Sequence, residues 1–335
     1  MRILVTGHAG FIGSHVAHRL LDRGDEVFGF DNLNDYYDVA LKHARVSRLE
    51  ARKGFTATVG DLADRTAVES LFDRVRPDRV VHLAAQAGVR YAASNPHVYA
   101  SSNLTGFLHV LEGCRSHRVG HLVFASTSSV YGGNTTLPFS EHQPTEHPLT
   151  FYAATKKANE AMAHSYAHLY GIPCTGLRFF TVYGPWGRPD MAFFSFTRAI
   201  IEGRPIQVFN HGHHTRDFTY VDDIVAGVVA SLDRPARPDP DWSGNRPDPA
   251  TSSAPYRIYN IGNARPVELL RYIRLLEQAI GKTAELQMQP LQPGDVPDTL
   301  ADITDLSAET GYSPETPVEI GVPRFVEWFR DHYRL

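Results

Sequence analysis

The segment RILVTGHAGFIGSHVAHRLLDRG (residues 2–24) decides the fold, because it leads from a strand into a helix through a glycine-rich turn. Its opening residues form an apolar run typical of a buried strand, and its second half has the apolar spacing of a helix. Gly7, Gly10 and Gly13 lie at the junction. Glycine there permits a tight turn and lets backbone N–H groups approach a phosphate at the helix N-terminus. The segment therefore predicts a phosphate-binding turn.

Strand-like and helix-like runs alternate through the first half of the chain. Strands are expected at 2–7, 26–31, 56–61, 79–85, 121–126 and 173–180, and helices at 11–24, 68–75, 103–117 and 152–171. Such βαβ alternation predicts an α/β, Rossmann-type doubly wound parallel sheet with helices on both faces.

The alternation breaks after about Phe180. Residues 1–180 are therefore predicted to form one Rossmann-type domain, and residues 181–335 a smaller α/β domain that contains the strand at 256–262 and the helix at 268–281. The two are expected to interleave, with part of 215–235 returning to the first. Residues 234–255 are rich in Pro, Asp, Gly and Ser, which predicts a loop.

Composition narrows the class of protein. The 335 residues carry a formal net charge of -4, which offers no general attraction to nucleic acid or to an anionic membrane. No apolar run approaches the ~20 residues that cross a bilayer. The chain begins with a strand, which leaves no room for a signal peptide. The cysteines, Cys114 and Cys174, favour a reducing compartment, although a disulfide stays open. A cytoplasmic protein without nucleic-acid or membrane partners is expected.

Acidic residues after the second and third strands indicate which dinucleotide binds. Asp31 ends the second strand, at the distance where an acidic residue meets the adenine ribose. A carboxylate there accepts from both ribose hydroxyls and repels a 2′-phosphate, so NAD is favoured over NADP. Asp61 and Leu62 follow the third strand and are predicted adenine contacts, although Asp61 could instead cap the next helix.

A tyrosine and a lysine share one helix face at the predicted reacting end. Tyr152 and Lys156 stand four residues apart. A free tyrosine has a pKa near ~10, and an adjacent ammonium together with an oxidised nicotinamide is expected to lower the pKa of Tyr152 so that it can act as a base. This spacing is common by chance and gains meaning only with a hydroxyl at a neighbouring strand end. Thr127, in FASTSSVYGG (124–133), supplies that hydroxyl.

Several motifs together resemble one enzyme family. They are TGHAGFIG (6–13), Asp31, LAAQAGVR (83–90), Asn103, the hydroxyl run 126–129 and YAATK (152–156). This set is similar to extended short-chain dehydrogenase/reductases that act on nucleotide sugars. Segments 177–192, 214–223 and 292–302 resemble their substrate-binding segments, and 31–46 and 252–263 point to the UDP-glucuronate 4-epimerase branch. The resemblance covers essentially the whole chain.

The resemblance implies a role for each matching residue. Thr127, Tyr152 and Lys156 would be catalytic, with Tyr152 as the base. Cofactor binding is implied for Gly7, Gly10, Phe11, Ile12, Gly13, Asp31, Asn32, Asp61, Leu62, Ala84, Ala85 and Lys156. Substrate binding is implied for Arg90, Thr127, Ser128, Ser129, Tyr152, Thr181, Arg188, Gln207, Phe209, Arg216 and Asp295. A homodimer is implied as well, paired through residues 152–170 and a helix starting near Asn95.

The implied activity is interconversion of UDP-glucuronate and UDP-galacturonate through a transient 4-ketone, with NAD retained by the enzyme. Neutral-sugar 4-epimerases of this family typically carry Asn where this chain has Thr181. A 4,6-dehydratase needs acidic residues after its threonine, whereas Ser128 and Ser129 stand here. We expect these hydroxyls, with Thr127 and Thr181, to hold the C6 carboxylate. A UDP-glucuronate decarboxylase, a UDP-glucose/UDP-galactose 4-epimerase and, in another class, a non-catalytic NAD sensor remain alternatives.

Two histidine groups have spacings that invite a metal interpretation. His164 and His168 stand four residues apart, and His211, His213 and His214 are clustered. Neither group has a thiolate or carboxylate at a metal-site spacing. A solvated helix face and a polar loop are the better interpretations, so no metal is expected.

Overall fold

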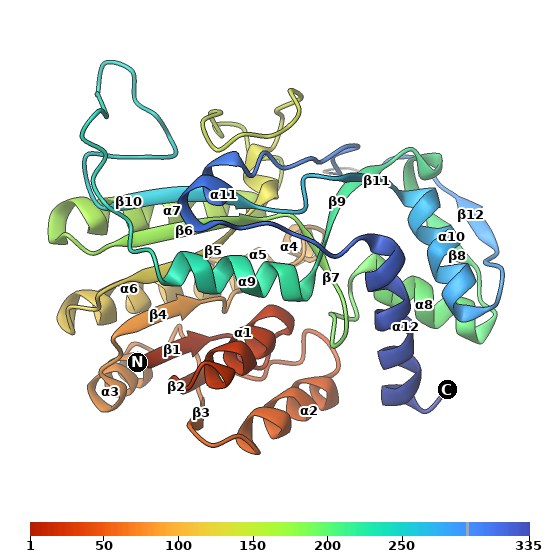
Figure 1. Ribbon diagram of the computed structural model, residues 1–335, viewed down its shortest axis with the longest axis horizontal. Helices are drawn as coiled ribbons and strands as arrows, with labels where there is room; N and C mark the ends of the chain where they lie inside the picture. The colour runs from red at the N-terminus through yellow and green to blue at the C-terminus, as the bar shows by residue number, and fades with distance from the viewer. Residues whose placement is uncertain (293–294) are drawn as a thin grey trace.

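A seven-stranded parallel sheet forms the larger part of the computed structural model, which describes residues 1–292 and 295–335 (Figure 1). The order is β10-β6-β5-β4-β1-β2-β3. The strands are β1 (Arg2–Thr6), β2 (Glu26–Asp31), β3 (Phe55–Val59), β4 (Arg79–His82), β5 (Leu122–Thr127), β6 (Cys174–Phe179) and β10 (Tyr256–Ile261). The order reverses beside β1, which is where open α/β sheets bind ligands. The predicted fold class is confirmed.

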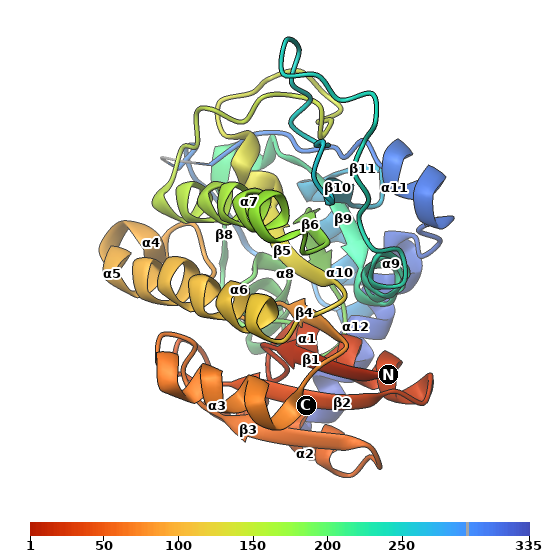
Figure 2. The same ribbon diagram turned by 90° about the vertical axis from the view of Figure 1, so that its left-hand side faces the viewer.

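Helices cover both faces of this sheet (Figure 2). On one face lie α1 (Phe11–Asp22), α2 (Val39–Glu50) and α9 (Val221–Leu232), and on the other α3 (Arg65–Val75), α6 (Gly106–Ser116) and α7 (Phe151–Tyr170). Successive strand residues point to opposite faces. Ile3 and Val5 accordingly pack in the core under α1 and α9, and Leu4 packs in the core under α3 and α6.

The smaller part is built after β6. It has a three-stranded sheet of β11 (Pro266–Glu268), β9 (Thr215–Tyr220) and β7 (Thr181–Tyr183), and a two-stranded sheet of β12 (Leu286–Met288) and β8 (Ile206–Val208). Its helices are α8 (Ala192–Glu202), α10 (Leu269–Ile280) and α12 (Val318–Tyr333), and α11 (Thr304–Thr310) packs on α9 and β10. Shorter helical segments are α4 (Tyr91–Ser94), α5 (Pro96–Tyr99), η1 (Ala100–Thr105), η2 (Ser128–Tyr131) and η3 (Phe209–Gly212).

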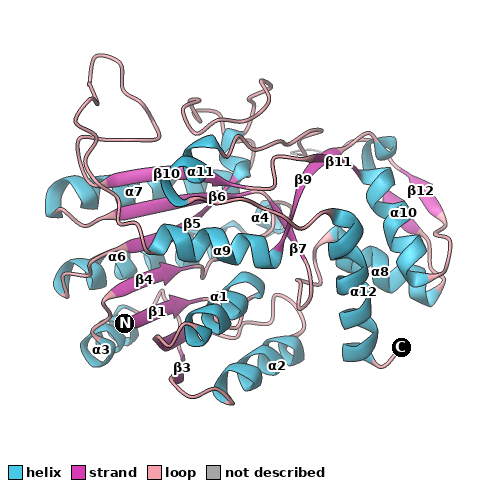
Figure 3. Ribbon diagram, in the orientation of Figure 1, coloured by secondary structure: helices cyan, strands magenta, loops and turns pink. Residues whose placement is uncertain are grey.

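The predicted division at residue 180 needs one correction. Strand β10 was placed in the substrate domain, but it pairs in parallel with β6 as the last strand of the large sheet. The physical reason is that its apolar residues (Ile258 and Ile261 are 0% exposed) complete both layers of the large core. The segment before it, 234–255, contains no helix or strand and projects from the molecule (Figure 3).

The sequence predicts neither a membrane-spanning helix nor a metal site, and the structure bears on these two points only for the residues that it describes. Within 1–292 and 295–335, no helix is long and apolar enough to cross a bilayer. Over the same ranges, no group of three or more His, Cys, Asp or Glu side chains could hold a metal ion. His164 instead pairs with the Ser252 hydroxyl at 2.8 Å. Cys114 and Cys174 are both buried and free.

Candidate functional site

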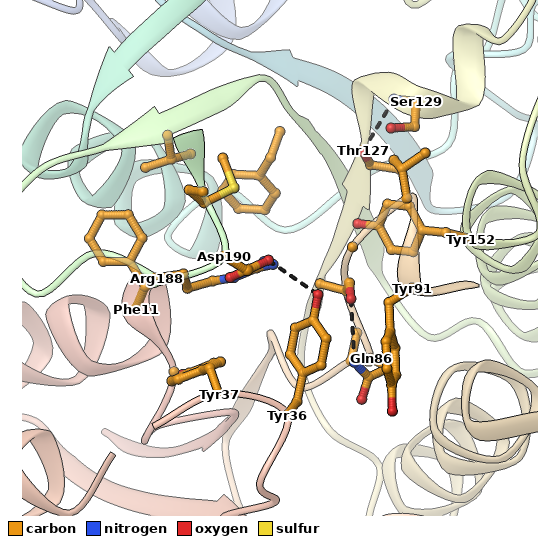
Figure 4. A pocket seen from close by; sticks show the side chains of 18 of the residues that line it. Phe11, Tyr36, Tyr37, Gln86, Tyr91, Thr127, Ser129, Tyr152, Arg188 and Asp190 are labelled. Atoms are coloured by element: carbon orange, nitrogen blue, oxygen red, sulfur yellow. Dashed lines mark hydrogen bonds and ion pairs between the residues drawn. The ribbon is translucent and has the colours of Figure 1, made fainter. Parts of the chain in front are cut away.

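A cavity of about 1160 Å³ opens at the carboxyl ends of the large sheet's strands and extends between the two parts of the chain (Figure 4). Every residue predicted for catalysis, cofactor binding or substrate binding lines this one cavity. Most small-molecule sites have volumes of ~300–1000 Å³. This cavity is larger, so it has room for two ligands side by side.

The glycine turn forms one end of the cavity. Gly7 has φ +78°, a conformation that favours glycine, and a Cβ on Gly13 would overlap the Gly7 carbonyl oxygen. Gly10 is the N-cap of α1, where no side chain caps the helix and no acidic residue occupies the first turn. The first N–H groups of α1 are therefore available to an anion.

Asp31 and Asp61 lie beyond the turn. Asp31 Oδ2 accepts a hydrogen bond from Ala9 N (3.2 Å), and Oδ1 accepts one from Leu33 N (2.9 Å). Asp61 accepts from Asn32 Nδ2 (3.2 Å) and from Ala63 N (2.8 Å). The N-cap of α3 is Asp64. Asp61 therefore does not cap this helix, and it lines the cavity.

Thr127 and Tyr152 face one another in the middle of the cavity (Figure 4). Burial raises the pKa of the Tyr152 hydroxyl, while its hydrogen bond with Thr127 and the charge of Arg188 act in the opposite direction. The predicted lowering of the Tyr152 pKa by the Lys156 ammonium together with an oxidised nicotinamide stays a prediction, because without the nicotinamide charge burial outweighs the groups that favour the phenolate. The free-energy cost of burying the phenolate is larger than the stabilisation that Thr127 and Arg188 give to it.

Lys156 is only 2% exposed. Burial lowers the pKa of its ammonium to about 8, and the Glu160 carboxylate one helical turn away acts in the opposite direction. The Lys156 ammonium therefore loses its proton closer to neutral pH than an exposed lysine would.

The four hydroxyls at the end of β5 have different partners. Ser126 Oγ donates to Glu160 Oε1 at 2.6 Å, and Glu160 also pairs with the fully buried Arg178 at 2.9 Å. Thr127 Oγ1 accepts from Ser129 N at 3.2 Å. Ser126 therefore belongs to a buried network that joins β5 and β6 to α7. All four residues line the cavity, but only Ser126 has its hydroxyl bonded to Glu160.

Predicted substrate residues from distant segments meet at the other end of the cavity. Arg90 Nη2 donates to Asp295 Oδ2 at 3.4 Å, and the Arg90 guanidinium lies 4.6 Å from the centre of the Phe209 ring. Arg216 donates to Pro297 O at 2.6 Å, and Asp295 raises its pKa while burial lowers it more strongly. Within the predicted segment 292–302, Pro293 and Gly294 lie outside the described residues.

Comparison with known proteins identifies the family. A family model described as the NAD dependent epimerase/dehydratase family matches residues 3–262. The chain belongs to this family.

The similar proteins include UDP-glucuronate 4-epimerases and a UDP-glucose 4-epimerase. The probable UDP-glucuronate 4-epimerase of Rhizobium meliloti (strain 1021) is 48% identical over 340 residues, covering 100% of this chain and 98% of the relative. The crystal structure of UDP-glucuronic acid 4-epimerase from Bacillus cereus with UDP-glucuronic acid and NAD is 33% identical, with a TM-score of 0.88 over 99% of this chain and 100% of the other. A UDP-glucose 4-epimerase structure from Thermotoga maritima is 29% identical, with a TM-score of 0.84 over 99% and 100%.

The NAD of this family fits the residues present. The uncapped N-terminus of α1 and the glycine turn offer backbone donors for a pyrophosphate, and Asp31 stands at the end of β2 for the adenine ribose. Lys156 lies further along the same cavity wall. These groups would hold NAD with its reacting end toward Tyr152.

Several cavity residues were missed by the sequence analysis, notably the partners of Arg188 between the two parts of the molecule. Arg188 forms a two-pronged ion pair with Asp190 (3.0 and 2.5 Å), and Tyr36 donates to the same carboxylate at 3.2 Å (Figure 4). Tyr91 packs on Tyr36 with ring centres 4.8 Å apart. Tyr36 lies in segment 31–46, which resembles the UDP-glucuronate 4-epimerase branch, so the resemblance could have pointed to it, but no role was assigned to the tyrosines of this segment.

Asn103 joins α7 to the loop after β4 from a π-helical turn, η1. Its side-chain oxygen accepts from Gln86 N at 2.8 Å, and its amide nitrogen donates to the Thr155 hydroxyl at 3.1 Å. Asn159 donates to the Asn103 carbonyl at 2.6 Å. Such π-turns occur frequently at functional sites, and this one ties the loop after β4 to the helix that carries Tyr152.

Proposed function

We propose that this protein is a UDP-glucuronate 4-epimerase that interconverts UDP-glucuronate and UDP-galacturonate with a retained NAD. The observation that carries the proposal is that one cavity is lined by the glycine turn, by Tyr152 with Thr127 and Lys156, and by the hydroxyl residues Ser128 and Ser129. Support comes from relatives named for this activity, at 48% identity for the Rhizobium protein.

The chain's own residues would move the proton of the sugar's 4-hydroxyl. When bound at the glycine turn and Lys156, NAD would supply the hydride acceptor and donor for C4 and, in its oxidised form, the positive charge that favours the Tyr152 phenolate. Tyr152 accepts the hydroxyl proton as the 4-ketone forms and gives it back when the ketone is reduced on its other face. Thr127 holds the same oxygen by a hydrogen bond. The ring must turn over between these steps.

The carboxylates on the cavity wall argue against a dehydratase. Dehydration needs an acidic or basic group beside the reacting sugar to remove the C5 proton. Among the described residues, the acidic side chains that line the cavity are Asp31, Asp61, Asp190 and Asp295. Each already has a hydrogen-bonding partner, and none belongs to the strand end that carries Thr127. Ser128 and Ser129 offer only neutral hydroxyls.

The test of function is incubation of the purified protein with UDP-glucuronate, with the products identified by NMR. UDP-galacturonate at equilibrium with the substrate is the expected result. Release of UDP-pentose would instead identify a decarboxylase, and turnover of UDP-glucose alone a neutral-sugar epimerase. Tightly held NAD without conversion of any UDP-sugar would identify an NAD sensor.

The purified protein is expected to contain NAD without supplementation, because the reaction returns the hydride to the cofactor and needs no exchange. The protein is denatured, and NAD and NADP in the supernatant are measured enzymatically. Nearly one NAD per chain is expected. A protein that arrives empty and requires stoichiometric NADP would contradict both the cofactor and the reaction cycle.

We further propose a homodimer that pairs through α7 and the helical segment 96–116. Ala161 and Ser165 form a small, exposed strip on α7, and Leu169 on the same helix is 67% exposed. Small side chains allow two helices to approach closely, and a second copy would cover Leu169.

Light scattering at micromolar concentration is expected to give about twice the monomer mass of 37.3 kDa. Ala161→Arg should shift the protein to the monomer by blocking close approach. Ser47→Arg, at an exposed position on α2, is the matched control and should leave the mass unchanged. A wild-type monomer would refute the dimer.

A further inference from the structure

The Arg45 guanidinium is completely buried (0% exposed) and joins two distant segments. On the cofactor side, Nη1 donates to the carbonyl of Ala9, inside the glycine turn, at 2.9 Å. On the substrate side, Nη2 donates to the carbonyls of Trp186 (2.6 Å) and Gly187 (3.0 Å). Nη1 also donates to the Tyr37 hydroxyl at 2.7 Å. One side chain thus connects the two ends of the site.

This cation has no ionic partner of its own. No carboxylate among residues 1–292 and 295–335 forms an ion pair with it, and its Nε has no hydrogen-bond partner. Burial lowers the pKa of Arg45 and Arg188 acts in the same direction, while Tyr37 and, more weakly, Asp31 act against them. A buried charge without a partner is costly. A pyrophosphate at the turn that contains Ala9 would supply the missing negative charge.

The substrate side of this contact is a strained turn. Trp186 has φ +61°, a left-handed conformation that is uncommon for a bulky residue and persists only where the surroundings enforce it. Its carbonyl is one of the two that Arg45 holds. Arg188, a predicted substrate residue, comes two positions later. The contacts of Arg45 therefore fix the backbone from which the Arg188 side chain extends into the cavity.

We infer that Arg45 is a positioning residue that couples the two ligand sites, so that NAD and the UDP end of the substrate each favour the arrangement that joins Ala9 to Trp186 and Gly187. This inference rests on the proposed function, because it takes NAD and a UDP-sugar as the two ligands. Arg45 does not line the cavity, so it acts through the backbone it holds.

The test measures how fast the holoenzyme releases NAD, with and without UDP. Bound NAD is chased with a fluorescent NAD analogue, and UDP is the probe because it lacks the sugar that could cover the nicotinamide directly. Coupled sites change each other's affinity by ~5–150-fold. UDP is expected to slow NAD release about tenfold in the wild type and less than about twofold in Arg45→Met. Arg45→Lys, which keeps the charge but not the two-armed geometry, should fall between them.

Arg48→Met is the matched control on the same helix. The Arg48 guanidinium lies 4.4 Å from the Trp186 ring centre but does not bond the two carbonyls, so UDP should slow release as in the wild type. If Arg45→Met does not fold, Arg45→Lys and Tyr37→Phe, which removes one contact, carry the test.

The outcomes separate the inference from the function. Faster NAD release in the Arg45 variants, with an undiminished effect of UDP, would mean that Arg45 only stabilises the fold and would overturn the inference. Loss of the UDP effect in Arg48→Met would do the same, since it would assign the coupling to packing on Trp186. A wild-type protein that holds no NAD would instead remove the proposed function itself.

Discussion

Tyr152→Phe is expected to reduce kcat for UDP-glucuronate epimerisation by at least ~10²–10⁴-fold, the usual contribution of a positioned acid/base. The variant loses only the hydroxyl that takes the proton from the sugar's O4. Because the ring keeps its packing, with its centre 6.1 Å from that of Tyr99, the fold and both binding sites should remain. Turnover is followed by NMR, and binding of UDP-glucuronate by calorimetry.

Tyr36→Phe is the matched control, since it removes a hydroxyl from the same cavity that bonds Asp190 (Figure 4). Its loss of kcat should be much smaller, because that hydroxyl transfers no proton in the proposed reaction. Similar losses in the two variants, or near-normal turnover in Tyr152→Phe, would show that the base is assigned wrongly.

Replacing Ser128 and Ser129 by alanine is expected to weaken the preference for UDP-glucuronate over UDP-glucose. Both residues line the cavity beside Thr127, and we expect them, with Thr181, to hold the C6 carboxylate. Neutral donors hold a carboxylate without burying a second charge. Each lost hydrogen bond to a charged group should cost ~1.5–3 kcal/mol, or roughly ten- to a hundredfold in discrimination. The kcat/KM ratio for the two substrates measures it.

The same variants, or Thr181→Ala, should release detectable UDP-pentose. A 4-keto glucuronate is a β-keto acid, and it loses carbon dioxide only when the C5–C6 bond stands roughly perpendicular to the plane of the C4 carbonyl. A carboxylate held nearer that plane lacks this alignment. Substrate labelled at C6 allows trapped labelled carbon dioxide to be compared with the epimer formed.

Ser126→Ala is the matched control from the same run. Its hydroxyl bonds Glu160 instead of a ligand, so its loss should affect stability but neither selectivity nor carbon dioxide release. If the Ser128/Ser129 double variant keeps wild-type selectivity and forms no pentose, the carboxylate is held elsewhere.

Local patterns in the sequence predicted the elements of the large sheet, because strand and helix periods and the glycine turn are properties of neighbouring residues. The strand at 79–85 was expected to be longer than the observed β4, which ends at His82. The position of β10 could not be predicted in this way. A strand of six residues carries no signal for which sheet it joins, and only the long return through the substrate part brings it beside β6.

The residues of the site were predictable, but their environments were not. All of them line one cavity because the carboxyl ends of parallel strands meet at one edge of the sheet. The pKa of Tyr152 depends on burial, which sequence does not give. The separate role of Ser126 could have been predicted from the sequence, because Ser126 and Thr127 are consecutive strand residues and therefore point to opposite faces of the sheet. The role of Arg45 could not have been predicted from local patterns, because three of its contacts (Ala9, Trp186 and Gly187) lie 36, 141 and 142 residues away in the sequence.

The late return of β10 governs the order in which the protein can fold as it leaves the ribosome. Until Ile261 has been synthesised, β6 has an open edge whose backbone N–H and C=O groups can pair with another chain. Helix α1 also lacks α9, which packs on it and begins only at Val221. The sheet that carries the cofactor site therefore cannot be completed until the chain has been translated through most of the substrate part, to the end of β10.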